Sequence, residues 1–278
     1  MPSTPPTKRA PPLTCRIIGL GGIGQVVAIY LSLFLNSLNR AARLLLIDGD
    51  SYEHANESRM FCGNLGNKAA VMQADLAGRL SPATAVTLLA VPEYVTPDNL
   101  DRLIPSGRGE SVLLCVDNHA TRKLVAEYAG QLDDICLVSG GNDGVGPDAA
   151  GTIRQGTEGN VQIYLRRGGV DCSPTLTKYH PEIAHPADAR PDEPRPDEEG
   201  CAELFASGST PQILFSNLTA AVAMMNSWYW LQTTGELDYS ELVFDTRTGR
   251  MTPLPLPGVG GPVRATKQME PGILPGSS

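Results

Sequence analysis

The sequence of 278 residues has no apolar segment long enough to cross a membrane as a helix. Its most apolar stretch, Val26 to Leu38, is interrupted by Ser32 and Asn36 and is shorter than the roughly 20 residues that a span requires. The proline-rich N-terminal residues contain no apolar region of the kind found in a signal peptide. Basic residues are not in excess, since 22 Lys and Arg stand against 30 Asp and Glu and give a net charge of −8. We therefore expect no membrane and no nucleic acid as a partner.

The six cysteines include no Cys-x-x-Cys pair. In a chain of this length their scatter argues against a disulfide framework and predicts a reducing, cytoplasmic location. Cys172, His180, His185 and Cys201 match no compact zinc pattern, so we do not expect zinc. The remaining cysteines are expected to be small core residues, and they are Cys15, Cys62, Cys115 and Cys136.

Short apolar runs typical of strands alternate with segments of helical periodicity over the first half of the chain. The predicted strands are 14–18, 44–47, 85–91, 111–116 and 135–139, and the predicted helices are 25–39, 67–80 and 119–132. This alternation predicts an α/β fold with a Rossmann-like, doubly wound and mostly parallel sheet. An alternating run at 161–165 and a hairpin at 242–253 predict a C-terminal antiparallel extension, and residues 211–231 read as a long apolar helix.

We expect one domain, over residues 14–252, between a flexible leader (1–13) and a flexible tail (253–278). Residues 181–200 are rich in proline and acidic side chains and hold almost nothing apolar. Such a composition cannot build a core, so it predicts a mobile crossover loop inside the domain.

The turn GLGGIG, residues 19–24, ends the first predicted strand and begins the first helix. Glycines at such a turn let backbone N–H groups approach a phosphate, and the N-terminus of the helix adds positive potential. Asp48 ends the second strand, where a carboxylate accepts hydrogen bonds from a ribose. These features predict a nucleotide site made by Gly19, Gly21, Gly22, Gly24 and Asp48, and they leave an NAD(P)-dependent oxidoreductase open.

The residues after Asp48 favour a more highly charged ligand than a dinucleotide. Asn56, Arg59 and Lys68 supply an amide, a guanidinium and an ammonium group, which together would neutralise a triphosphate. Asp117 follows the fourth strand, with Asn118 next to it, at an edge where open α/β sheets bind ligands. A carboxylate there suits Mg²⁺ held against phosphate oxygens.

The motifs GLGGIG, DGD, N-x-x-R, G-x-K and C-x-D-N-x-x-x-R occur in this order. Together they resemble the ThiF/MoeB/ubiquitin-activating-enzyme superfamily of adenylyltransferases over about residues 14–252. The resemblance implies ATP-dependent adenylation of the C-terminal carboxylate of a ubiquitin-like or sulfur-carrier protein that ends in Gly-Gly, with ATP and Mg²⁺ as cofactors. It makes the domain an ATP-binding adenylation domain. The Cys-x-x-Cys pairs of zinc-containing members are missing.

The same resemblance implies a role for each matching residue. The glycines of the loop, Asp48, Asp50 and Asn118 would lie at the nucleotide, Asn56 and Arg59 would hold phosphates, Lys68 would contact the α- and γ-phosphates, and Asp117 would bind Mg²⁺. Cys201 stands where ThiF-like members carry a reactive cysteine, so it is the candidate acceptor thiol. Arg59, Lys68, Asp117 and Cys201 are thus the expected catalytic residues.

Residues 211–231 are too apolar to leave a broad face in water, and this predicts a homodimer that uses the long helix. The resemblance implies the same, and it adds a conjugating enzyme as a further partner. Two alternatives to the adenylyltransferase remain open. One is the NAD(P)-dependent oxidoreductase, and the other is a non-catalytic, nucleotide-binding half of an activating complex.

Overall fold

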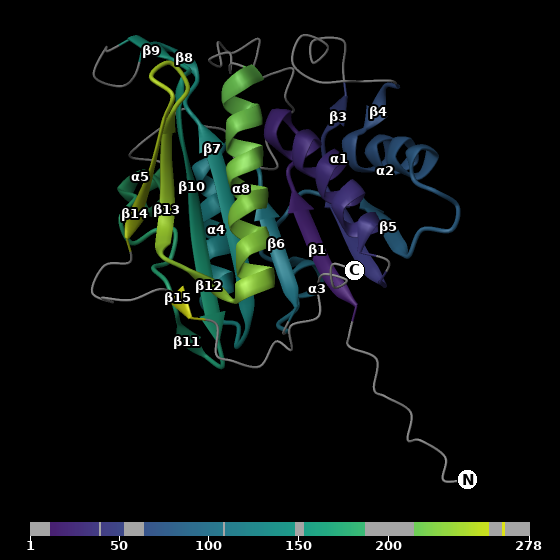
Figure 1. Cartoon of the computed structure of the whole chain (residues 1–278). Coiled ribbons are helices and arrows are strands. Elements are labelled where there is room, and N and C mark those ends of the chain that lie inside the picture. The colour runs from purple at the N-terminus through teal and green to yellow at the C-terminus, as the bar shows by residue number, and fades with distance from the viewer. Residues whose placement is uncertain are drawn as a thin grey trace, which may run out of the picture.

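The computed structural model describes residues 12–38, 40–52, 64–107, 109–147, 153–186, 214–255 and 263–264. A nine-stranded sheet forms the centre, with helices on both faces (Figure 1). The strand order is β14-β13-β10-β7-β6-β1-β2-β5, and β11 pairs with β10. Within the described ranges, no helix is both long and apolar enough to cross a membrane.

Five strands form the parallel half of the sheet, namely β1 (Leu13–Ile18), β2 (Ala42–Ile47), β5 (Val86–Val91), β6 (Glu110–Leu114) and β7 (Ile135–Asn142). The antiparallel half consists of β10 (Glu158–Arg167), β11 (Val170–Asp171), β13 (Tyr239–Asp245) and β14 (Arg250–Pro255). Three short two-stranded sheets join β3 (Ser51–Tyr52) to β4 (Gly66–Asn67), β8 (Val145–Pro147) to β9 (Ile153–Gln155), and β12 (Glu236–Leu237) to β15 (Val263–Arg264).

The helices divide between the two faces of the sheet (Figure 1). One face is covered by α1 (Gly22–Ser37), α2 (Lys68–Arg79) and α8 (Leu214–Thr234), whose buried residues belong to one hydrophobic cluster. The other face carries α3 (Leu100–Leu103), α4 (His119–Ala129) and α5 (Pro181–Ala184), which share a second cluster. Each cluster removes a large apolar area from water, so the sheet is stabilised from both sides.

The chain reverses its direction of winding between β1 and β6. From β1 it proceeds through β2 to the edge strand β5, and it then returns to place β6 on the other side of β1. Ile18 pairs with both Ile47 and Leu114, so the carboxyl ends of these three strands lie at one edge. Open α/β sheets bind ligands at such a switch point.

The structure confirms the α/β fold, the mostly parallel sheet and the antiparallel C-terminal strands. Most helices and strands begin or end a few residues from the predicted positions, and two further differences concern the predicted loop and tail. Residues 181–184 form α5, because Ile183 is buried and packs in the second hydrophobic cluster. Residues 187–200 of the predicted loop lie outside the described residues. Strand β14 continues to Pro255, beyond the predicted start of the tail, because β13 supplies backbone partners as far as Tyr239.

His180 connects the segment before α5 to the antiparallel half of the sheet. Its Nδ1 lies 2.7 Å from Glu182 Oε1, and its Nε2 lies 3.1 Å from Glu241 Oε2 on β13. Asn160 on β10 donates a further hydrogen bond to Glu241. The hydrogen bond with Glu241 raises the pKa of His180 against the opposing effect of burial, and Glu182 contributes to the rise. Burial raises the pKa values of both carboxyls, but hydrogen bonds, including those from His180, hold the two pKa values below their ordinary range.

We predict that replacing His180 by Gln lowers stability in a pH-dependent way. A raised pKa in the folded state means that protonated His180 stabilises the protein fully below about pH 6.5 and that this contribution disappears as the pH rises through the raised pKa. We expect His180→Gln to lose about 1.5–3 kcal/mol at pH 6 and much less at pH 9. Urea unfolding at the two pH values measures the difference. The exposed His185 provides the control, and an equal loss at both pH values would contradict the assignment.

Candidate active site at the switch point

The backbone of the glycine loop after β1 packs so closely that Gly19 and Gly24 have no room for a side chain. Gly19 has a φ of +86°, a left-handed conformation that favours glycine. A Cβ added to Gly24 would lie 1.8 Å from the carbonyl oxygen of Gly19, and a Cβ added to Gly19 would lie 3.0 Å from the carbonyl group of Cys115. Helix α1 therefore begins directly above the ends of β1 and β6. Its N-cap is Gly21, which has no side chain to bond to the first N–H groups of the helix, so a ligand can approach them.

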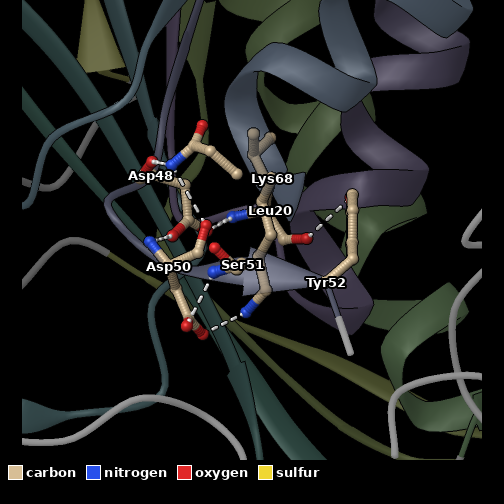
Figure 2. Close-up of polar contacts among 7 residues, drawn as sticks. Leu20, Asp48, Asp50, Ser51, Tyr52 and Lys68 are labelled. Carbon is tan, nitrogen blue, oxygen red and sulfur yellow. Dashed lines mark hydrogen bonds and ion pairs between the residues drawn. The ribbon is translucent and has the colours of Figure 1, made fainter. Parts of the chain in front are cut away.

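The carboxylate of Asp48 joins the glycine loop to the loop after β2 (Figure 2). One oxygen accepts a 2.6 Å hydrogen bond from the backbone N–H of Leu20, and the other accepts a 2.9 Å bond from the N–H of Asp50. The pKa of Asp48 is raised, because the effect of burial exceeds the opposing effects of the Lys68 charge and of these two N–H groups. A carboxylate offers about four lone-pair directions, so two acceptor positions remain for a ribose.

Lys68 and Asp50 form an ion pair beside this loop (Figure 2). The ammonium nitrogen lies 2.5 Å from Asp50 Oδ2, and Lys68 is only 1% exposed. Asn67 holds the backbone here, because its Nδ2 donates to the carbonyl oxygens of both Asp48 and Asp50, at 3.0 and 3.1 Å. The Asn67 side chain also caps α2 by accepting from the N–H of Ala70. The first residue of α2 is thus a buried cation fixed at the carboxyl edge of the sheet.

Asp117 and Asn118 follow β6 on the other side of the switch point. Asp117 is exposed, three residues beyond Leu114, the last residue of the strand. The side chain of Asn118 accepts a 2.7 Å bond from the N–H of Thr121 and is the N-cap of α4. Arg122 is buried and donates to the carbonyl oxygens of Val116 and Gly140, each at 2.9 Å. Arg122 therefore fixes the end of β6 against β7.

The structure thus brings together most of the candidate residues at this edge of the sheet, on loops and at the starts of helices. They are Gly19, Gly21, Gly22, Gly24, Asp48, Asp50, Lys68, Asp117 and Asn118. Three others, Asn56, Arg59 and Cys201, lie outside the described residues. Among the residues that are described, no group of three or more His, Cys, Asp or Glu side chains is arranged to hold a metal ion.

The described cysteines of the parallel sheet are core residues. Cys15, Cys115 and Cys136 are buried free thiols, as predicted, whereas Cys62 lies outside the described residues. Burial raises the pKa of Cys115 to about 12 and that of Cys136 to about 11. Because the thiolate is the nucleophile, these thiols are inert at neutral pH.

Sequence reasoning did not identify Asn67 as a residue that organises the site. Asn67 stands between Gly66 and Lys68 in the G-x-K motif, and its three hydrogen bonds depend on a loop conformation that the motif does not specify. The sequence feature that could have identified Asn67 is an Asn at the start of a predicted helix, a position where Asn favours an N-cap.

We predict that Gly24→Ala destabilises the protein and abolishes nucleotide binding. The new methyl group would collide with the Gly19 carbonyl oxygen, and overpacking of this kind costs about 1–3 kcal/mol. A matched control is Gly78→Ala in α2, where an added Cβ meets nothing within 4 Å and helix propensity favours alanine by about 1 kcal/mol. In thermal unfolding, Gly24→Ala should have a lower Tm than the wild type and Gly78→Ala a higher one. A Gly24→Ala protein as stable as the wild type would contradict the close contact.

Solved structures share this fold at low sequence identity. E. coli MccB with AMPCPP and MccA matches with a TM-score of 0.60 and 15% identity, over 88% of this chain and 64% of that chain. E. coli MccB with ATP matches with a TM-score of 0.60 and 15% identity, over 91% and 67%. The microcin C7 biosynthetic enzyme MccB with N-formylated MccA matches with a TM-score of 0.59 and 16% identity, over 89% and 67%. The chain thus spans about two thirds of the length of these proteins.

Comparison with curated proteins by sequence finds no match. The model of the ThiF family, in contrast, matches residues 7–228. This match covers well over half of the sequence and includes both sides of the switch point, from the glycine loop to Asp117 and on into α8. The chain therefore belongs to the ThiF family.

Proposed function

We propose that this protein activates a carboxylate by ATP-dependent adenylation. The observation that carries the proposal is the buried Lys68, which begins α2 beside the glycine loop and forms an ion pair with Asp50. A buried ammonium group at a phosphate-binding edge suits a triphosphate. A dinucleotide carries less charge, and an oxidoreductase would leave this cation without a role. The solved MccB structures with ATP and with AMPCPP support ATP as the nucleotide.

The proposed reaction has one bond-forming and one bond-breaking event. A carboxylate oxygen of the substrate attacks the α-phosphorus, the bond to the β-phosphate oxygen breaks, and pyrophosphate leaves with the electron pair. The products are an acyl adenylate and pyrophosphate. The glycine loop and the N-terminus of α1 would hold the α-phosphate, and Lys68, with Arg59 from outside the described residues, would neutralise the charge that develops on the leaving group. Positioning and electrostatic stabilisation then supply most of the rate.

Asp117 suits the role of magnesium ligand. Its carboxylate is exposed at the switch point and makes no hydrogen bond or ion pair in the part of the chain that is described. A hard oxygen ligand without a protein partner fits Mg²⁺ bound together with phosphate oxygens. The metal would neutralise phosphate charge when bound.

We further propose that the carboxylate belongs to the C-terminus of a polypeptide, and specifically to a ubiquitin-like or sulfur-carrier protein that ends in Gly-Gly. The presence of MccA in solved MccB structures supports a peptide or protein substrate in this fold. The acyl group would pass to Cys201 as a thioester, or directly to a sulfur donor or a conjugating partner. This finer proposal rests on the sequence motifs, because Cys201 and residues 187–200 lie outside the described residues.

We predict that Mg·ATP, and not NAD or NADP, stabilises the folded protein. A ligand that binds only the folded state at about one hundred times its Kd adds about 2.7 kcal/mol of stability. In the wild type, Mg·ATP should raise the Tm more than ATP with EDTA does. This difference in Tm, which depends on magnesium, should vanish in Asp117→Ala. With a candidate carrier present, Asp117→Ala should also lose exchange of labelled pyrophosphate into ATP.

The matched control is Asp238→Ala, at an exposed position before β13, which should keep the magnesium-dependent shift. Stabilisation by NAD or NADP instead of ATP would overturn the proposed function. A magnesium-dependent shift that persists in Asp117→Ala would overturn the metal assignment alone.

We also propose that the protein is a homodimer that uses α1 and α8. An open apolar groove of about 290 Å³ lies between these helices and is lined by Leu31, Phe34, Val222, Met225, Asn226, Trp228 and Tyr229. Both helices carry further exposed apolar side chains, including Tyr30, Leu33 and Trp230. A contiguous apolar surface of this kind is typical of a protein interface.

We predict that Val222→Asp converts the dimer to a monomer. The substitution places a charge in the apolar interface, where desolvation without a partner is strongly unfavourable. Light scattering at micromolar concentration measures the change. Val170→Asp is the control, because Val170 is 64% exposed in β11 whereas Val222 is 58% exposed. A wild-type protein that is monomeric under these conditions would refute the dimer.

A further inference from the structure

Asn217 is a buried amide that the described part of the chain leaves without a partner. It lies near the start of α8 and is 0% exposed. Neither its Nδ2 nor its Oδ1 has a hydrogen-bond partner. Buried polar groups are nearly always paired, because an unpaired amide forfeits its hydrogen bonds to water. An apolar residue would fill the same space in this helix at no such cost, so the amide calls for an explanation.

The Asn217 side chain faces the start of α1. A Cβ added to Gly22, the first residue of α1, would lie 2.3 Å from Asn217 Nδ2 and 3.4 Å from Oδ1. The donor end of the amide is therefore the end nearer to the glycine loop. Gly22 must be glycine for this contact to exist, since a methyl group would displace the amide. Residues separated by almost two hundred positions in the sequence thus meet at one helix terminus.

The N-terminus of a helix favours an anion, because its first N–H groups and its dipole present positive potential. Gly21 caps α1 without a side-chain hydrogen bond, so the first N–H groups of a 16-residue helix are not satisfied by a cap. The unpaired donor of Asn217 stands beside them, and both features point to a ligand that accepts hydrogen bonds.

We infer that Asn217 is a further phosphate-binding residue of the site, whose Nδ2 donates a hydrogen bond to a phosphate oxygen held at the N-terminus of α1. The inference rests on the proposed function, since it adds a residue to the same nucleotide site. It assigns to α8 a direct part in holding the phosphate, in addition to its packing against β7 and α1. A bound phosphate would supply an acceptor for the Asn217 Nδ2, which has none in the described structure.

The test compares ligands with and without phosphate. Calorimetry would measure the affinities of Mg·ATP, AMP and adenosine for the wild type, Asn217→Ala and Asn217→Asp. A hydrogen bond to a charged group corresponds to about ten-fold or more in affinity, so Asn217→Ala should bind ATP and AMP about ten-fold more weakly and adenosine equally well. Asn217→Asp should be weaker still toward both phosphates, because its carboxylate repels them. Thr234→Ala, at an exposed position at the C-terminal end of the same helix, should change none of the three.

Each other outcome has a distinct meaning. If the wild type binds ATP and AMP and Asn217→Ala binds both equally well, the inference is overturned while the proposed function stands. The inference also fails if adenosine affinity falls in parallel or if Asn217→Ala melts well below the wild type, since either result indicates a structural role. A wild type that binds neither ATP nor AMP would overturn the proposed function and this inference together.

Discussion

The hydrogen bonds accepted by Asp48 hold the two loops of the candidate site against each other. Each carboxylate oxygen takes one backbone N–H, from Leu20 in the first loop and from Asp50 in the second. Side chains and backbone groups on both loops depend on this link, because neither loop is part of the sheet. A charged acceptor strengthens such bonds, and partial burial makes them costly to break. Asp48 thus acts on the architecture of the site as well as offering acceptors for a ribose.

Lys68 and Asp50 form an ion pair within the candidate site. Lys68 is almost completely buried, and a buried cation requires a partner, which Asp50 supplies. A phosphate that approached Lys68 would compete with Asp50 and leave the more exposed carboxylate to water. The ion pair therefore holds the ammonium group of Lys68 in position, and a phosphate can replace Asp50 as its partner. Asp117 differs in this respect, since its exposed carboxylate forms no ion pair in the described ranges and is available to a cation.

The elements that the sequence predicted best are those with strong local signals. Residues 44–47 are a continuous apolar run and residues 14–18 are a short β-rich run. They form most of β2 and β1, because both faces of the parallel sheet are covered. The glycines of residues 19–24 similarly predict the turn after β1. Asp48 and Lys68 were placed at the right edge because carboxyl ends of parallel strands meet there. In contrast, residues 181–184 contain too few apolar side chains to predict α5, which depends on the burial of Ile183 against a distant cluster.

What sequence reasoning missed involves pairs of residues that only the tertiary fold brings together. Arg122 was visible as part of a motif, yet its bond to the Gly140 carbonyl oxygen depends on the adjacency of β6 and β7. Gly22 and Asn217 are a stronger case, because nothing local in α8 marks an asparagine for contact with the glycine loop. The absence of a side chain at Gly22 is usually explained by the approach of a phosphate. Here the space beside Gly22 is occupied by an amide from another helix, so glycine at this position is required for the approach of the residue that we propose to bind the phosphate.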